Sequence, residues 1–147
     1  MTSGPEKPAR PRRLYIDTSA YLCMLLGQQG SERLSRETVG AQLLSSVLLV
    51  LETKRNLVRL ARSGHLEPEQ YKSAIERLDI DISLFSLRDL TLSLCQSNTL
   101  PAVTTPRSLD LAHLRTALWF HATEPLDRFL TMDASQEQAA KELGLAV

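Results

Sequence analysis

Short apolar segments that alternate with longer segments of helical spacing constrain the fold of this chain most strongly. Apolar runs at residues 14–16, 41–44 and 128–131 each precede a segment with a helical pattern. A strand followed by a helix is the unit from which parallel sheets are built. The pattern therefore predicts an α/β fold, a three-layer sandwich with a central, mainly parallel sheet flanked by helices.

Capping residues and stop signals set the expected element boundaries. Helices are predicted over residues 20–26, 45–63, 68–78, 87–98, 108–120 and 135–143. Alternating apolar and polar residues predict a further strand at 80–84, and 145–147 is expected to be the last strand. The segment between Gly27 and Ala41 is expected to be a polar loop.

The chain is long enough for one domain. Its 147 residues, 43% of them hydrophobic, can bury one core. Residues 1–13, with three prolines, are expected to form a disordered arm before a domain at 14–147. No membrane-length apolar run and no signal peptide are present, so a cytoplasmic protein without a membrane partner is expected. Cys23 and Cys95 are expected to be reduced structural thiols.

The charges balance, with 17 Lys plus Arg against 17 Asp plus Glu. Composition therefore gives no sign of the broad cationic field of duplex-DNA binders, and any contact with nucleic acid must come from local patches.

Acidic residues fall where the expected strands end. Asp17 and Asp133 each follow an apolar strand, Asp110 lies in the first turn of a helix that Ser108 is expected to cap, and Glu52 lies on the long helix. Ligands of open parallel sheets bind beyond the carboxyl ends of the strands. Alternatives remain open: Asp110 and Asp133 also suit helix capping, and Glu52 also suits a pair with Arg55.

Convergent carboxylates repel one another unless a cation neutralises them, and oxygen ligands suit Mg²⁺ or Mn²⁺. A bound ion of this kind can activate water for phosphodiester hydrolysis without a side-chain nucleophile. The sequence contains no GxSxG, HExxH or P-loop motif.

The chain resembles PIN domains, in particular the VapC toxins of prokaryotic toxin–antitoxin pairs, over residues 14–147. The resemblance rests on LYIDTSAYL, SSVLLVLETKRNL, RSLDLAHLRTAL and FLTMDASQEQAAKELGLAV, which match family segments in the family's order. Pro106, near the entry to a helix where relatives are more apolar, and the long arm depart from the pattern.

The resemblance implies a PIN-like sandwich with Mg²⁺- or Mn²⁺-dependent endoribonuclease activity. It implies a homodimer and inhibition by a cognate VapB-like antitoxin. It assigns the four active-site acids to Asp17, Glu52, Asp110 and Asp133. Thr18, Ser19 or Thr131 would supply a hydroxyl that orients water or a carboxylate.

Arginines continue the helix face of Glu52. Arg55, Arg59 and Arg62 follow Glu52 at i+3, i+7 and i+10, so they form one stripe. The stripe is a candidate RNA-binding surface, because guanidinium groups pair with phosphate. A salt-bridged solvent face is the alternative.

For the aromatic and imidazole side chains near Asp110, a structural role is preferred to a role in catalysis or RNA binding. His113 is expected to be a partly buried, hydrogen-bonded histidine rather than a general acid. Trp119 and Phe120 are expected to pack in a core or a dimer rather than stack on bases. The apolar group at residues 22–26 suits either the core or an antitoxin groove.

Other functions compete with the ribonuclease. A PIN scaffold that binds RNA or a partner protein without cutting is the first alternative. A haloacid-dehalogenase-type phosphatase is the second, but that class requires DxD[TV], and Ser19 stands where the second Asp would be.

Overall fold

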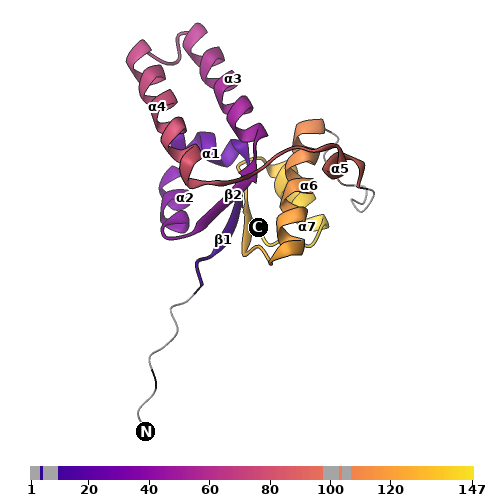
Figure 1. The fold of residues 1–147 in the computed structure, drawn as a ribbon. Helices are drawn as coiled ribbons and strands as arrows, with labels where there is room; N and C mark the ends of the chain where they lie inside the picture. The colour runs from indigo at the N-terminus through magenta and orange to yellow at the C-terminus, as the bar shows by residue number, and fades with distance from the viewer. Residues whose placement is uncertain (1–3, 5–9, 98–102, 104–106) are drawn as a thin grey trace.

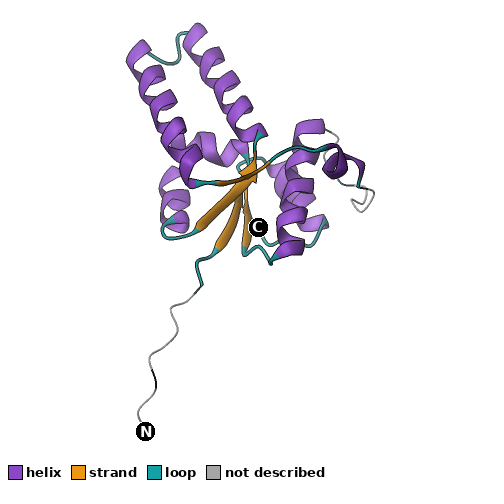
Figure 2. Ribbon diagram, in the orientation of Figure 1, coloured by secondary structure: helices purple, strands orange, loops and turns teal. Residues whose placement is uncertain are grey.

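Four parallel strands form the centre of the molecule. The structure, a computed structural model, describes Gly4, residues 10–97, Val103 and residues 107–147. The strands are β1 (Arg13–Ile16), β2 (Gln42–Ser46), β3 (Ser86–Arg88) and β4 (Arg128–Leu130), in the order β3-β2-β1-β4. Every pairing is parallel. The predicted α/β class is confirmed (Figures 1 and 2).

Helices cover both faces of the sheet (Figure 2). They are α1 (Thr18–Leu25), α2 (Ser31–Thr38), α3 (Leu48–Arg62), α4 (Pro68–Leu84), α5 (Leu92–Gln96), α6 (Ser108–Thr123) and α7 (Ala134–Glu142). The side chains of β1 alternate between the two faces, as strand geometry requires. Leu14 and Ile16 pack with residues of α1 to α4, and Tyr15 packs with residues of α6 and α7. The three-layer arrangement follows from these two cores.

The helices α3 and α4 form a hairpin that projects from the sheet (Figure 1). Glu67 and Gln70 form a capping box at the start of α4. Pro68 occupies the first position of the helix, where a backbone N–H would have no partner within the helix, so proline is tolerated there. Where α3 starts, Ser46 Oγ accepts a hydrogen bond from Leu48 N (3.1 Å), so Ser46 supports the helix although Val47 is the N-cap.

The predicted strand at 80–84 is wrong, because this segment is the end of α4. Ile80 and Leu84 alternate with polar residues but are exposed on one helix face, while Asp81 is buried. The predicted helix at 87–98 is wrong over its first half. Leu87 lies in β3, and α5 begins only at Leu92, after Thr91 Oγ1 has accepted a hydrogen bond from Leu94 N (3.1 Å).

Two predictions at other places are also wrong. The supposed polar loop after Gly27 contains α2, whose single buried residue, Leu34, left little apolar signal. Residues 145–147 form no strand, although Phe129 N donates to Ala146 O (2.7 Å). The sheet's first strand begins at Arg13, one residue before the expected domain start.

Other expectations concern the cysteines, membrane-spanning helices and the N-terminal arm. Cys23 is buried, Cys95 is exposed, and both are free thiols. None of the helices in the described part of the chain is both long and apolar enough to cross a membrane. Most of the expected N-terminal arm, residues 1–3 and 5–9, lies outside the described residues.

Candidate functional site

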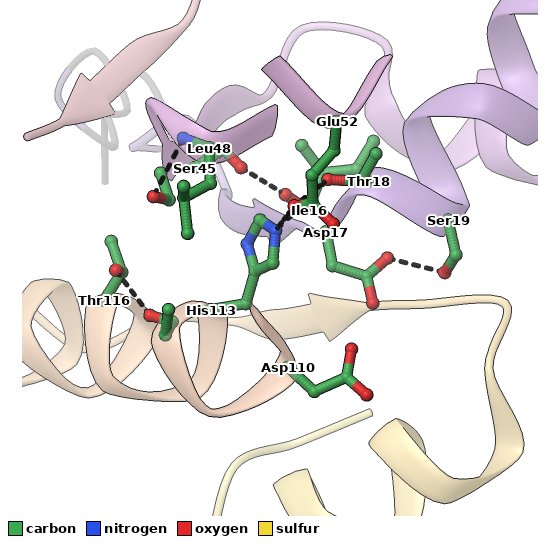
Figure 3. Close-up of polar contacts among 12 residues, drawn as sticks. Ile16, Asp17, Thr18, Ser19, Ser45, Leu48, Glu52, Asp110, His113 and Thr116 are labelled. Atoms are coloured by element: carbon green, nitrogen blue, oxygen red, sulfur yellow. Dashed lines mark hydrogen bonds and ion pairs between the residues drawn. The ribbon is translucent and has the colours of Figure 1, made fainter. Parts of the chain in front are cut away.

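The carboxyl edge of the sheet brings Asp17, Glu52 and Asp110 into one region (Figure 3), and Arg107 links Asp110 to Asp133. Asp17 directly follows β1 and its N–H donates to Leu130 O of β4 (3.1 Å), so the ends of these two strands lie side by side. Asp133 follows β4, and Glu52 lies in the second turn of α3, after β2. Asp110 lies in the first turn of α6, and in Figure 3 its carboxylate and that of Asp17 point toward one another.

Asp17 is held by hydroxyl and amide donors. Its Oδ1 accepts hydrogen bonds from Ser19 Oγ (2.7 Å) and Ala20 N (3.0 Å), which caps α1. Ser19 Oγ also contacts Thr131 Oγ1 (3.1 Å), so two of the predicted hydroxyl residues link the ends of β1 and β4. Burial raises the pKa of Asp17, and the hydrogen bond from Thr131 and the nearby His113 oppose this rise only in part.

Glu52 is held by Thr18 and His113. Its Oε1 accepts from Thr18 Oγ1 (2.8 Å) and lies 2.8 Å from His113 Nε2. Burial acts to raise the pKa of Glu52, but the hydrogen bond and charge of His113, with Thr18 and Arg55, outweigh it and the net shift is downward. The Thr18 hydroxyl therefore hydrogen-bonds one of the predicted acids.

His113 is buried, with 2% of its surface exposed. Its Nδ1 lies 2.7 Å from Tyr15 Oη in the core, so the imidazole joins the core to Glu52. An Nε2–H donates to Glu52, and whether Nδ1 donates to Tyr15 Oη or accepts from it depends on the protonation of the ring. The predicted buried, hydrogen-bonded histidine is confirmed.

Asp110 and Asp133 share one cation, Arg107. Arg107 Nε lies 2.7 Å from Asp110 Oδ2, and Arg107 Nη2 lies 2.6 Å from Asp133 Oδ2. Its two carboxylate partners raise the pKa of Arg107. Asp133 also caps α7, since its Oδ1 accepts from Ser135 N (2.9 Å) and Gln136 N (3.1 Å). The capping interpretation of Asp133 is thus confirmed and does not exclude a second role.

The pKa of Asp133 shifts in the direction opposite to that of Asp17. Partial burial acts to raise it, but the hydrogen bonds from Gln136 and Ser135 and the guanidinium of Arg107 outweigh this effect and lower it. Asp133 is therefore stabilised as an anion, whereas burial of Asp17 works against its ionised form.

The donor chemistry at this edge fits a hard divalent cation, because the acids offer only carboxylate oxygen. As the side chains stand, the described residues contain no group of three or more His, Cys, Asp or Glu side chains that could hold a metal ion. Arg107 already binds two of the acids, so a metal ion would have to displace its guanidinium. The Arg107 side chain is 61% exposed, which leaves it room to move away.

The arginine stripe on α3 faces solvent. Arg55, Arg59 and Arg62 are exposed, and Arg59 Nη2 donates to Asn56 Oδ1 (3.0 Å). Over the part of the chain that is described, none of the three arginines has an ion-pair partner. The salt-bridged alternative therefore lacks support, and the RNA-binding role stays a prediction.

Sequence reasoning missed the part that Arg107 plays. The signal was present, because Arg107 precedes Asp110 by three residues, a spacing that places two side chains on one helix face. Its second partner, Asp133, is 26 residues further along the chain and meets Arg107 only in the folded protein.

Comparison of the chain with protein-family models and with curated proteins gave no match. A fold of this class hosts many functions, so the function has to be argued from the residues of the site.

Proposed function

We propose that this protein is a metal-dependent endoribonuclease of the PIN-domain, VapC-toxin type, which hydrolyses RNA phosphodiester bonds. The observation that carries the proposal is that Asp17, Glu52 and Asp110 lie together at the carboxyl edge of the sheet (Figure 3), with Asp133 joined to Asp110 through Arg107. Such a gathering costs stability unless it serves to bind a cation. The four family-like segments supply those same acids.

The acids have distinct roles in this proposal. Asp17, Asp110 and Asp133, with Glu52 beside them, would hold Mg²⁺ or Mn²⁺. When bound, the metal supplies an activated water and offsets charge on the phosphate oxygens. Ser19 and Thr131 fix the Asp17 carboxylate, and Thr18 with His113 fixes Glu52. These hydrogen bonds position the ligands before substrate arrives, which is how supporting residues contribute at metal sites.

RNA would run from the acids along Arg55, Arg59 and Arg62. Arg59→Glu tests this path, because reversing one phosphate contact should weaken RNA binding about threefold to tenfold at low salt and reduce the salt dependence of the affinity. Fluorescence anisotropy with a labelled RNA in EDTA measures both quantities. An unchanged affinity at low salt would remove the stripe from the RNA path.

A cytoplasmic location, a homodimer and a VapB-like antitoxin belong to the same proposal. A groove of about 480 Å³ between α1, α2 and α4 offers an antitoxin an apolar surface, with Met24, Leu25 and Phe85 in its wall and Arg77 and Asp81 at its side. An amphipathic helix from a partner is the ligand that such a groove accommodates. The groove supports the residue 22–26 region as a partner surface.

A non-catalytic PIN scaffold is the second candidate, and Arg107 is the observation that favours it. Its guanidinium supplies a cation to Asp110 and Asp133 within the chain itself, so the outer acids have a partner without any metal. The scaffold would keep the arginine in place permanently, whereas the nuclease has to release it.

One experiment separates the two candidates. The purified chain, freed of any bound antitoxin, is incubated with mixed RNA in Mn²⁺ or Mg²⁺, with and without EDTA, beside Asp17→Asn and Asp110→Asn. Asp79→Asn, an exposed acid on α4, is the matched control. The nuclease predicts cleavage that EDTA and both site variants abolish and the control retains. Cleavage that survives chelation contradicts the metal mechanism, and binding without cleavage by folded protein favours the scaffold.

A further inference from the structure

A small cavity beside α6 is unlike the acidic site. It has a volume of about 270 Å³ and is lined by residues of α5 and α6, by the last residue of β3, and by Ser97. We call it the Trp119 cavity; its lining residues are Arg88, Ser93, Leu94, Ser97, Arg115, Leu118, Trp119 and Ala122. Its size lies just below the roughly 300–1,000 Å³ of small-molecule sites, which suits one compact ligand.

An indole and a guanidinium are stacked in this cavity. The Arg88 guanidinium carbon lies 4.2 Å from the centre of the Trp119 ring. Trp119 is 39% exposed, whereas its neighbour Phe120 is 8% exposed and belongs to the core. The expectation that these two residues pack in a core or a dimer is confirmed as core packing for Phe120, whereas Trp119 is not part of the core. An exposed indole beside a planar cation is the kind of surface on which nucleic-acid bases stack.

The positive charge of the cavity is not balanced by an acid. Arg88 and Arg115 both line it, and no Asp or Glu does. Across the described residues neither arginine has an ion-pair partner, and the buried Arg88 Nε has no hydrogen-bond partner. A buried donor without a partner is rare and needs an explanation, and a guanidinium group suits a phosphate oxygen.

We propose that the Trp119 cavity binds one nucleotide of single-stranded RNA. The base stacks on the Trp119–Arg88 pair, and the phosphate accepts hydrogen bonds from Arg88 and Arg115. The inference rests on the proposed function, since the RNA is the substrate of that site. Trp119 lies nine residues beyond Asp110 on α6, about 13 Å along the helix axis and two and a half turns away, so the two side chains start from opposite faces of the helix. A strand bound here would have to pass around α6 to reach the acids.

Trp119 is also the natural reporter of this cavity, because it is the chain's one tryptophan. The full-length protein in EDTA is titrated with adenosine monophosphate, with a short oligoribonucleotide and with inorganic phosphate while the intrinsic fluorescence is recorded. The nucleotide and the oligoribonucleotide are expected to change the Trp119 emission at concentrations where phosphate alone does not.

Substitutions test the individual contacts. Trp119→Leu and Arg88→Lys remove the stack, and each is expected to weaken binding of a labelled oligoribonucleotide about 5- to 100-fold in fluorescence anisotropy, the range for losing one stacked base. Arg115→Ala is expected to weaken it and to lower its salt dependence. Arg36→Ala, an exposed arginine on α2, should bind like the wild type. Circular dichroism melts confirm that each variant is folded.

Three outcomes would overturn the inference. They are an unchanged Trp119 emission with every RNA, a response to phosphate that equals the response to the nucleotide, and an acidic peptide that binds in preference to RNA. RNA cleavage in Mn²⁺ is measured separately. Cleavage without a Trp119 response would contradict the subsite and support the proposed function. A Trp119 response without cleavage would support the subsite and contradict the proposed function.

Discussion

The two pairs of acids at the sheet edge are the same chemical groups in opposite surroundings. The inner pair, Asp17 and Glu52, is held by hydroxyls, an amide and a buried imidazole. The outer pair, Asp110 and Asp133, shares the exposed guanidinium of Arg107, while the other oxygen of Asp133 accepts from two amides of α7. The partners of the inner pair are fixed by the packing of the core, whereas the exposed Arg107 side chain can move away from its two acids. The inner pair is therefore fixed in place, and the outer pair can exchange its partner.

The largest effect is expected from removing one acid of each pair. Asp17→Asn and Asp110→Asn should each lower metal-dependent RNA cleavage about 100- to 1,000-fold, the range for losing one group that stabilises charge in a transition state. If both pairs serve one metal centre, the double variant should be no slower than the slower single variant. Initial cleavage rates measure this, and fully multiplicative losses would show that the pairs act separately.

The next effect concerns stability and the inner pair alone. His113→Asn removes the imidazole bonds to Tyr15 Oη and Glu52, although Thr18 still donates to Glu52, and the expected cost is about 1–3 kcal/mol. A chain of this size loses about 2–4 °C of Tm per kcal/mol. Thermal melts should show a clear drop, while the exposed His65→Asn should melt like the wild type. Equal melting of both variants would contradict the structural role of the imidazole.

A smaller effect is expected at the outer pair. Arg107→Ala removes the cation that competes for Asp110 and Asp133, so the affinity for Mn²⁺ should rise about threefold to tenfold, as expected for losing exposed ion pairs. Isothermal titration calorimetry measures the Kd, with Arg36→Ala as the control. A lower affinity in Arg107→Ala would mean that the arginine helps to shape the metal site instead of blocking it.

The smallest expected effects are changes in stability, which should have opposite signs for Asp17→Asn and Asp133→Asn. The pKa of Asp17 is raised on folding, so its ionisation destabilises the native state, and Asp17→Asn should raise Tm at pH 7. The pKa of Asp133 is lowered on folding, so its stabilising effect is present above the unfolded pKa and is lost as the pH falls through the folded value.

Asp133→Asn should accordingly lower stability at pH 7 by about 0.3–1 kcal/mol, the value of a carboxylate charge at a helix N-terminus, since Asn still caps the helix. Melts at pH 7 and at pH 3 measure both variants. The two shifts should oppose one another at pH 7 and shrink in acid, and shifts of the same sign would contradict the comparison.

The strands β1, β2 and β4, and the acids that follow them, were predictable because they depend on local patterns. The strand at 14–16 is a continuous buried apolar run, and a parallel sheet brings the residues after its strands to one edge. The elements that were mispredicted lacked such a pattern. In α4, Ile80 and Leu84 are exposed apolar residues that imitate a strand's alternation, and in α2 only Leu34 faces the core.

The partners of the acids depend on contacts between distant segments, which no spacing rule supplies. His113 was assigned correctly as buried, but its bonds to Tyr15 and Glu52 cross 98 and 61 residues of chain. Arg107 and Asp133 meet for the same reason. The sequence therefore predicted which acids gather, and only the fold determined what neutralises each of them.

The central position of β1 has a consequence for synthesis of the chain on the ribosome. This strand pairs with β2 through Leu14 and Leu43, but its other neighbour is β4, whose Arg128 pairs with the same Leu14. A nascent chain that ends before β4 carries β1 with one edge unpaired, and open edges recruit other strands. Asp133 also follows β4. The last strand to be translated therefore closes the sheet and completes the acidic edge in one step, so incomplete chains lack both a protected fold and a finished site.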